Sequence, residues 1–388
     1  MLHTTEMNSL LSPFQLNSLK LPNRVVMAPM TRNKSKRNVP GPDVAQYYRR
    51  RAEGGVSLII TEGTAVGHKA SHAYPNVPNF HGKEALEGWR KVVEEVHRAD
   101  GKIFPQLWHV GSVRQTHHCH NEGVDNSGGQ CCYKEKVPGY APSPIPHPYI
   151  KGAEIPHEMS KKDILDVIEA FAKAALNAKK LGFDGVEIHG AHGYLIDQFF
   201  WAYTNQRTDE YGGTLGQRTR FATEVVQAVR NAVGQDFPID FRFSQWKLGD
   251  YNAKLANSAQ ELEFFLLPLV TAGVDLFHCS TRHFWDLAFS DSPLTLAGWT
   301  KKITGKPTIA VGSVGLDLDF IATKTGHSSP LQTLDKMNIL LNSLEKGEFD
   351  LIAIGRALLG DPLWIQKIAE GRINEITLFS KKALDDLF

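Results

Sequence analysis

A repeated order of strand followed by helix is the feature that most limits how this chain can fold. Eight short apolar or β-branched runs predict strands: Val25–Ala28, Ser57–Thr61, Ile103–Leu107, Val186–His189, Ile239–Phe243, Val274–Cys279, Thr308–Gly312 and Leu351–Gly355. Amphipathic stretches of helical period lie between several of them: Lys83–Ala99, Lys161–Leu181, Gln217–Val233, Ser258–Ala272 and Leu334–Lys346. Parallel strands need crossover helices, so this order predicts an α/β fold, a (β/α)8 TIM barrel.

An open, doubly wound sheet is the alternative fold. It is disfavoured because no Gly-x-Gly-x-x-Gly follows the first strand. We expect one domain over residues 1–388, with its core at about 11–370 and a small amphipathic tail at 371–388. The irregular stretch from His117 to Pro156 interrupts the third βα unit and predicts an extended loop over the active face.

Composition excludes several classes of function. The net charge is +1 and no polybasic block occurs, so we expect no nucleic-acid partner and no anionic membrane partner. No apolar run reaches the length of a membrane span and no secretory signal opens the chain, which predicts a cytoplasmic protein. Four cysteines do not make a disulfide framework in a chain of 388 residues.

Two imidazoles and a phenol gather where the fourth predicted strand ends. His189 closes this strand, and His192 and Tyr194 follow in a turn with Gly190 and Gly193. Such a set is suited to binding a carbonyl oxygen and delivering a proton. Metal binding by the two histidines is the alternative, but the His-Glu-x-x-His motif is absent.

Other strand ends carry groups that suit a flat heterocycle and a phosphate. Gln106 offers an amide, Arg242 a cation and Thr31 a hydroxyl. An ion pair of Arg242 with Asp240 or Asp184 is an equally open interpretation. The seventh strand ends in Gly312-Ser313-Val314-Gly315 and the eighth in Gly355-Arg356, where small residues and an arginine suit an anion.

Seven sequence blocks, in order, resemble the old yellow enzyme family of FMN-dependent NAD(P)H oxidoreductases. They are LLSPFQLNSLKLPNRVVMAPMTR, TEGTAV, FPQLWHVG, DGVEIHGAHGYLIDQFFWAYTNQRTDEYGGTLGQRTRF, RFSQWK, GSVGLD and DLIAIGRALLGDPLW. The resemblance implies an FMN site made from residues that match the family's motifs: Ala28, Pro29, Met30, Thr31, Gly63 (or Thr64), Gln106, Arg242, Gly312, Ser313, Gly355 and Arg356.

The same resemblance implies the reaction. His189 and His192 would bind the carbonyl oxygen of an activated alkene, Tyr194 would donate a proton, and Trp108 would lie beside the substrate. Trp285 is a further candidate for the substrate pocket, although packing explains it as well. NADPH or NADH would be the reductant in a ping-pong ene-reductase, and the protein would be a monomer or a homodimer. The cysteine quartet that larger relatives use for an iron–sulfur cluster is missing after Trp364, so we expect no such cluster.

Three alternatives stay open at this point. A metal or Schiff-base barrel enzyme acting on sugar phosphates lacks suitable strand-end groups, since Glu62 and Glu187 are the only candidates and we expect Glu187 to point outward. A flavin-storing protein without turnover is the second. The third concerns the run His117-His118-Cys119-His120 with Cys131-Cys132, which can bind metal or only shape substrate access, although its spacing matches no standard zinc motif.

Overall fold

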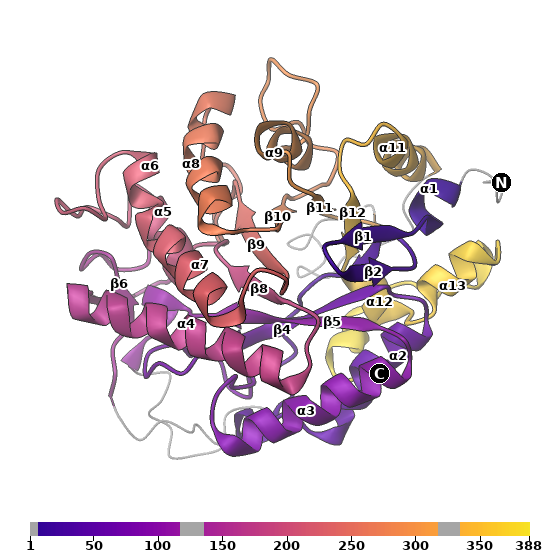
Figure 1. The fold of residues 1–388 in the computed structure, drawn as a ribbon, viewed down its shortest axis with the longest axis horizontal. Helices are drawn as coiled ribbons and strands as arrows, with labels where there is room; N and C mark the ends of the chain where they lie inside the picture. The colour runs from indigo at the N-terminus through magenta and orange to yellow at the C-terminus, as the bar shows by residue number, and fades with distance from the viewer. Residues whose placement is uncertain (1–6, 117–135, 317–333) are drawn as a thin grey trace.

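Eight parallel strands close into a barrel surrounded by helices (Figure 1). The computed structural model describes residues 7–116, 136–316 and 334–388. Around the barrel the strands follow the order β10-β11-β12-β3-β4-β5-β8-β9. Their bounds are Val25–Met27 (β3), Leu58–Ala65 (β4), Lys102–Trp108 (β5), Val186–His189 (β8), Ile239–Ser244 (β9), Leu276–Ser280 (β10), Thr308–Val311 (β11) and Leu351–Ile354 (β12). The predicted TIM barrel is therefore confirmed, and the doubly wound sheet is excluded.

Strand β4 differs most from its prediction. It continues to Ala65, past the expected end at Thr61, and its pairing with β5 resumes at Gly63 after a register shift between Ile60 and Gly63. The polar residues Thr61 and Glu62 lie at this shift, inside a fully buried strand.

The outer helices agree in part with the sequence pattern. They are α2 (Pro42–Glu53), α3 (Lys83–Arg98), α4 (Lys161–Leu181), α7 (Arg220–Val233), α8 (Ala259–Ala272), α9 (Leu296–Thr304), α11 (Leu334–Glu345), α12 (Arg356–Gly360) and α13 (Trp364–Ala369). The pattern missed α2, which contains three consecutive arginines, α9, which contains Gly298, and the short helices α12 and α13. It also merged α6 (Leu215–Arg218) with α7.

Helix caps follow local chemistry. Ser160 and Asp163 form a capping box at the start of α4. Gly182, Gly234 and Gly273 are the C-caps of α4, α7 and α8, with φ of 88°, 80° and 113°. These left-handed values favour glycine, since no Cβ is present to clash.

An N-terminal hairpin closes one end of the barrel. Strands β1 (Phe14–Leu16) and β2 (Leu19–Leu21) pair antiparallel, and their leucines pack on residues near the strand starts, such as Leu58, Leu276 and Leu351. The opposite end, where the strands finish, is thus left to form a site.

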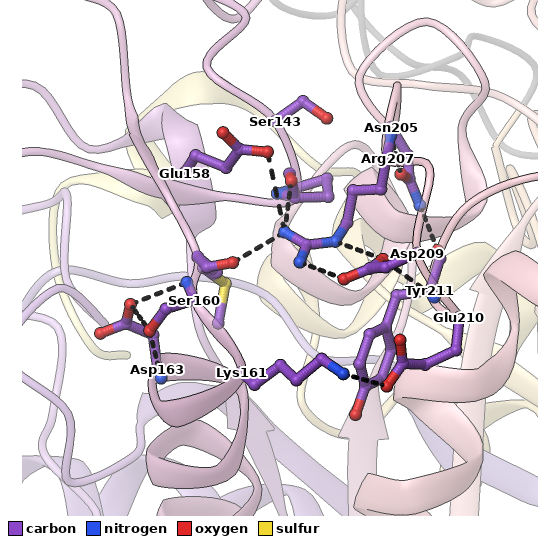
Figure 2. Close-up of polar contacts among 12 residues, drawn as sticks. Ser143, Glu158, Ser160, Lys161, Asp163, Asn205, Arg207, Asp209, Glu210 and Tyr211 are labelled. Carbon is purple, nitrogen blue, oxygen red and sulfur yellow. Dashed lines mark hydrogen bonds and ion pairs between the residues drawn. The ribbon is translucent and has the colours of Figure 1, made fainter.

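The insertion between β5 and α4 is anchored by the segment that follows the histidines. Its strands β6 (Tyr140–Ala141) and β7 (His157–Glu158) form a small parallel sheet. Arg207 donates to the carbonyls of Pro142 and Met159 at 2.9 and 2.7 Å and pairs with Asp209 at 2.6 Å (Figure 2). The NQRTDEY run therefore has a structural role, which is to hold this insertion on the barrel.

No helix in the described parts of the chain is long and apolar enough to cross a membrane. The His/Cys run at 117–132 lies outside the described residues, so metal binding by this run, or a role in shaping substrate access, stays a prediction. The single-domain boundaries stay a prediction as well.

Candidate active site

A cavity of about 400 Å3 opens at the carboxyl ends of the barrel strands. Most of the residues that the sequence singled out line it together: Ala28, Pro29, Met30, Thr31, Gln106, Trp108, His189, His192, Tyr194, Arg242, Gly312, Ser313, Gly355 and Arg356. They come from six of the eight strand ends, so barrel closure itself assembles the site.

His189 is a neutral hydrogen-bond donor at the end of β8. Burial, with the nearby Arg242 charge, lowers the pKa of His189 to about 3. The backbone N–H of Ala191 donates to its Nδ1 at 3.3 Å, which places the ring proton on Nε2. Its ring lies parallel to Trp108, with 5.9 Å between ring centroids.

His192 is held in a left-handed turn with φ of 64°. Its backbone N–H donates to Ser244 Oγ at 3.0 Å, and its Nε2 lies 2.8 Å from Ser280 Oγ. Burial lowers the pKa of His192 well below its usual range, so this ring is also neutral. The contact with Ser280 leaves Nδ1 for a ligand.

Tyr194 keeps its proton. Its hydroxyl lies 3.2 Å from the hydroxyl of Tyr74, and its ring is perpendicular to Trp108, with centroids 4.8 Å apart. Burial raises the pKa of Tyr194 well above its usual value. The phenol is therefore available as an acid throughout the neutral pH range.

A buried ion pair supports the turn that carries these groups. Lys247 Nζ lies 2.5 Å from Asp197 Oδ1, with side chains 1% and 0% exposed. The other oxygen of Asp197 accepts the N–H of Gly193 at 2.6 Å. The loop after β9 is thus tied to the position of His192 and Tyr194.

The cavity is strongly positive. Arg32, Arg242, Arg282, Arg356 and Lys381 line it, and none of the described lining residues is acidic. Such a lining favours a phosphate and any negative charge that develops in a bound ligand.

The structure does not place Gly63 and Trp285 among the lining residues. A Cβ on Gly63 would lie 2.4 Å from the Trp108 ring, so glycine there serves the packing of this tryptophan. Trp285 stacks on His283 with centroids 4.9 Å apart, and Lys336 Nζ lies 4.2 Å from its ring centroid. Packing therefore accounts for both residues.

Glu187 corrects another expectation. The prediction that it points outward is wrong, because residues two apart in a strand face the same side and His189 faces the cavity. Glu187 is fully buried and accepts hydrogen bonds from Gln106 and His278. Asp184, which was considered as a partner for Arg242, instead contacts His97 and Lys102.

Sequence reasoning missed part of one wall, because the 371–388 tail folds back to the cavity. Phe379, Lys381 and Leu384 line it, and the tail lies beside α2 (Figure 1). The side chain of Arg32 donates to the carbonyl oxygens of Ala383 and Asp386 at 2.9 and 2.6 Å. Contacts made to backbone carbonyls leave no signal in the sequence.

Trp246, Leu248, Tyr251 and Ser280 were also missed as lining residues. The Trp246 and His192 ring centroids lie 4.5 Å apart, and those of Trp246 and Tyr251 lie 4.9 Å apart. The RFSQWK block contains Trp246, so its position after the fifth strand was the one available signal.

The model of the NADH:flavin oxidoreductase / NADH oxidase family matches residues 9–375. The chain belongs to this family. The resemblance to old yellow enzymes is thereby confirmed, as is the class of oxidoreductase; the sugar-phosphate alternative is excluded. The expected cofactors, FMN with a nicotinamide nucleotide as reductant, are those of the family.

Individual relatives fit this assignment. An NADH oxidase of Thermoanaerobacter brockii is 32% identical over 96% of this chain and 52% of its own length. The 12-oxophytodienoate reductase 7 of Oryza sativa subsp. japonica is 41% identical over 58% of this chain and 56% of its own length. The chain thus spans about half the length of these relatives. Morphinone reductase in complex with tetrahydroNAD is similar in structure, with a TM-score of 0.75, 26% identity and coverage of 97% of this chain and 93% of that one.

The donor set of the cavity fits FMN. Arg242 Nε is buried without a hydrogen-bond partner among the described residues. Buried polar groups are normally hydrogen-bonded, so this atom is expected to pair with a ligand. A Cβ on Gly312 would lie 2.8 Å from the carbonyl oxygen of Thr281, so the backbone there approaches closely only as glycine. Ala28, Pro29 and Met30 offer an apolar wall for a ring.

Proposed function

We propose that this protein is an FMN-dependent ene-reductase that uses NAD(P)H to reduce the C=C bond of α,β-unsaturated carbonyl compounds. The observation that carries the proposal is the group of two neutral histidines and a protonated tyrosine over one cavity. A single site for both substrates implies a ping-pong order, in which the nicotinamide leaves before the alkene binds.

FMN would lie between the apolar wall and the histidines. Gln106 and Arg242 would hold the pyrimidine edge of the ring system, and Gly312, Ser313, Gly355 and Arg356 would hold the phosphate. When bound, FMN supplies the hydride chemistry.

The protein's own groups would activate and protonate the alkene. His189 Nε2–H and His192 would hydrogen-bond the carbonyl oxygen, which draws electrons from the β-carbon and makes it electrophilic. Neutral imidazoles suit this task, because they polarise the oxygen without giving up their protons. Tyr194 would then protonate the α-carbon, and the phenolate would recover its proton from solvent.

Tyr194→Phe tests the acid. It should slow reoxidation of the reduced enzyme by 2-cyclohexenone about 10²–10⁴-fold, the usual worth of a positioned general acid. Reduction of the enzyme by NADPH should be unaffected, and stopped-flow absorbance separates the two half-reactions.

Tyr74→Phe is the matched control. It removes the phenol hydroxyl that contacts the Tyr194 hydroxyl but leaves the proposed acid in place, so it should slow alkene reduction only severalfold. Equal losses in both half-reactions of Tyr194→Phe would show that Tyr194 is not the proton donor.

A further inference from the structure

Three ionisable residues lie one layer deeper in the barrel than the groups that line the cavity. Glu187, Asp240 and His278 stand two residues before His189, Arg242 and Ser280 on strands β8, β9 and β10. Strand pairing puts Glu187 beside Asp240, and His278 beside Arg242. Residues two apart share a face, so this trio supports the floor of the cavity from below.

Glu187 is the centre of the cluster. One of its oxygens accepts from Gln106 Nε2 at 2.6 Å, and the other accepts from His278 Nδ1 at 2.5 Å. The side chains of Glu187, Asp240 and His278 are fully buried. A carboxylate with an N–H donor on each oxygen, and the Arg242 charge close by, is stable without a metal ion, although the three residues could bring ligand atoms within 4.8 Å of one another.

Asp240 completes the cluster as a neutral acid. No side-chain donor among the described residues other than Glu187 reaches its carboxyl, and a hydrogen bond between these two carboxyl groups requires a proton on one of them. Burial and the charge of Glu187 raise the pKa of Asp240 well above its usual range. Burial also lowers the pKa of His278, which leaves it neutral. The deeper layer therefore contains one anion, Glu187. It lies close to the positive charge of Arg242 in the layer that lines the cavity.

Both neighbours of this anion face the cavity. Gln106 and Arg242 line the cavity, and they are 3% and 7% exposed. One amide N–H of Gln106 is engaged by Glu187, which prevents the carboxamide from flipping and leaves its oxygen and second N–H for a ligand. The charge of Arg242 is partly neutralised by Glu187, so its field in the cavity is weaker than that of a lone arginine.

We propose that Glu187 is a positioning residue for the flavin. It fixes the carboxamide of Gln106 and moderates the stabilisation that Arg242 gives to negative charge on the reduced ring, while Asp240 and His278 hold it in place. The inference rests on the binding of FMN in this cavity and goes beyond the proposed alkene reduction.

The test compares the affinity of each variant for reduced and oxidised FMN. Glu187→Gln removes the anion with little change of shape. It should raise the ratio of the two affinities at least tenfold in favour of reduced FMN, which is about 30 mV in the midpoint potential of a two-electron couple. Dye-equilibrated reduction followed by absorbance gives the potential, and titration of the apoprotein gives the affinity for oxidised FMN.

Asp240→Asn is the matched control. It replaces one neutral hydrogen-bond donor by another, so the ratio should stay at the wild-type value. In Glu187→Gln the negative charge could pass to Asp240, and the double variant Glu187→Gln/Asp240→Asn prevents this. The double variant should therefore raise the affinity ratio for reduced over oxidised FMN at least as much as Glu187→Gln does.

Two results would overturn the inference. An equal loss of affinity for both forms of FMN in the Glu187 variants would show a merely structural role. A tenfold shift in Asp240→Asn would show that the charge resides on Asp240; this variant is informative even where Glu187→Gln fails to fold. All measurements omit the alkene, so their failure leaves the proposed ene-reductase activity untouched.

Discussion

Replacing Lys247 by methionine should strongly destabilise the protein, because it leaves a buried anion without a partner. The Lys247–Asp197 pair is almost inaccessible to water, with side chains 1% and 0% exposed. Burial already raises the pKa of Asp197 even with the ammonium group present. Removing one partner of a buried pair costs about 3–5 kcal/mol, a large part of a typical folding free energy of about 5–15 kcal/mol.

A double-mutant cycle measures this effect. Asp197→Asn leaves the ammonium group unpaired and should cost a similar amount, whereas the double variant buries two neutral groups and should regain much of the loss. We expect a coupling energy of about 2–3 kcal/mol from urea denaturation of the apoprotein, followed by tryptophan fluorescence.

The control is an exposed pair of the same charge types. Lys162 and Asp166 lie 2.6 Å apart on α4, with side chains 81% and 46% exposed, so Lys162→Met should leave the denaturation midpoint unchanged. Additive effects of the two buried substitutions, within about 0.5 kcal/mol, would refute the reasoning.

Two further predictions concern strand β4. Burial raises the pKa of Glu62 to about 7, and its carboxyl accepts the backbone N–H of Arg32 at 2.8 Å. The folded state thus holds this proton to a higher pH than the unfolded chain, so the free energy of unfolding should fall by about 3 kcal/mol as pH rises from 4.5 to 7. Glu62→Gln should flatten this part of the pH–stability curve, and an unchanged slope would assign it to other groups. Gly63→Ala should displace Trp108, since the added Cβ would meet its ring, and should cost about 1–3 kcal/mol in thermal or urea denaturation. A wild-type melting curve with an unshifted tryptophan emission would contradict this expectation.

Local pattern predicted the architecture well. Each strand forms where a short apolar run occurs, and α4 begins and ends at the predicted residues, because its capping box and its C-cap glycine are written in adjacent positions. The helices that escaped prediction include α2, with its three consecutive arginines, and α9, with a glycine inside the helix, because such residues obscure the periodic apolar pattern on which the prediction relies.

The site was predictable to the extent that its residues stand at strand ends. His189, Gln106 and Arg242 face one cavity because barrel closure brings every strand end together, whatever the intervening sequence. Gly63, which the family resemblance implied, and Trp285, for which packing was an equally good account, are not among the residues that line the cavity. Gly63 lies inside β4 against the Trp108 ring, and Trp285 stacks on His283, contacts that only the tertiary structure decides.

By itself, the sequence determined the barrel, the family and the group formed by His189, His192 and Tyr194, because these depend on local patterns and short motifs. Only the tertiary structure decided the protonation states of these residues and the charges that surround them. The neutral state of the histidines, the anion on Glu187 below Arg242, the Asp197–Lys247 pair and the tail carbonyls around Arg32 all follow from burial and from contacts between distant segments. Burial and electrostatic interaction depend on distances in space, which strand register and barrel closure set.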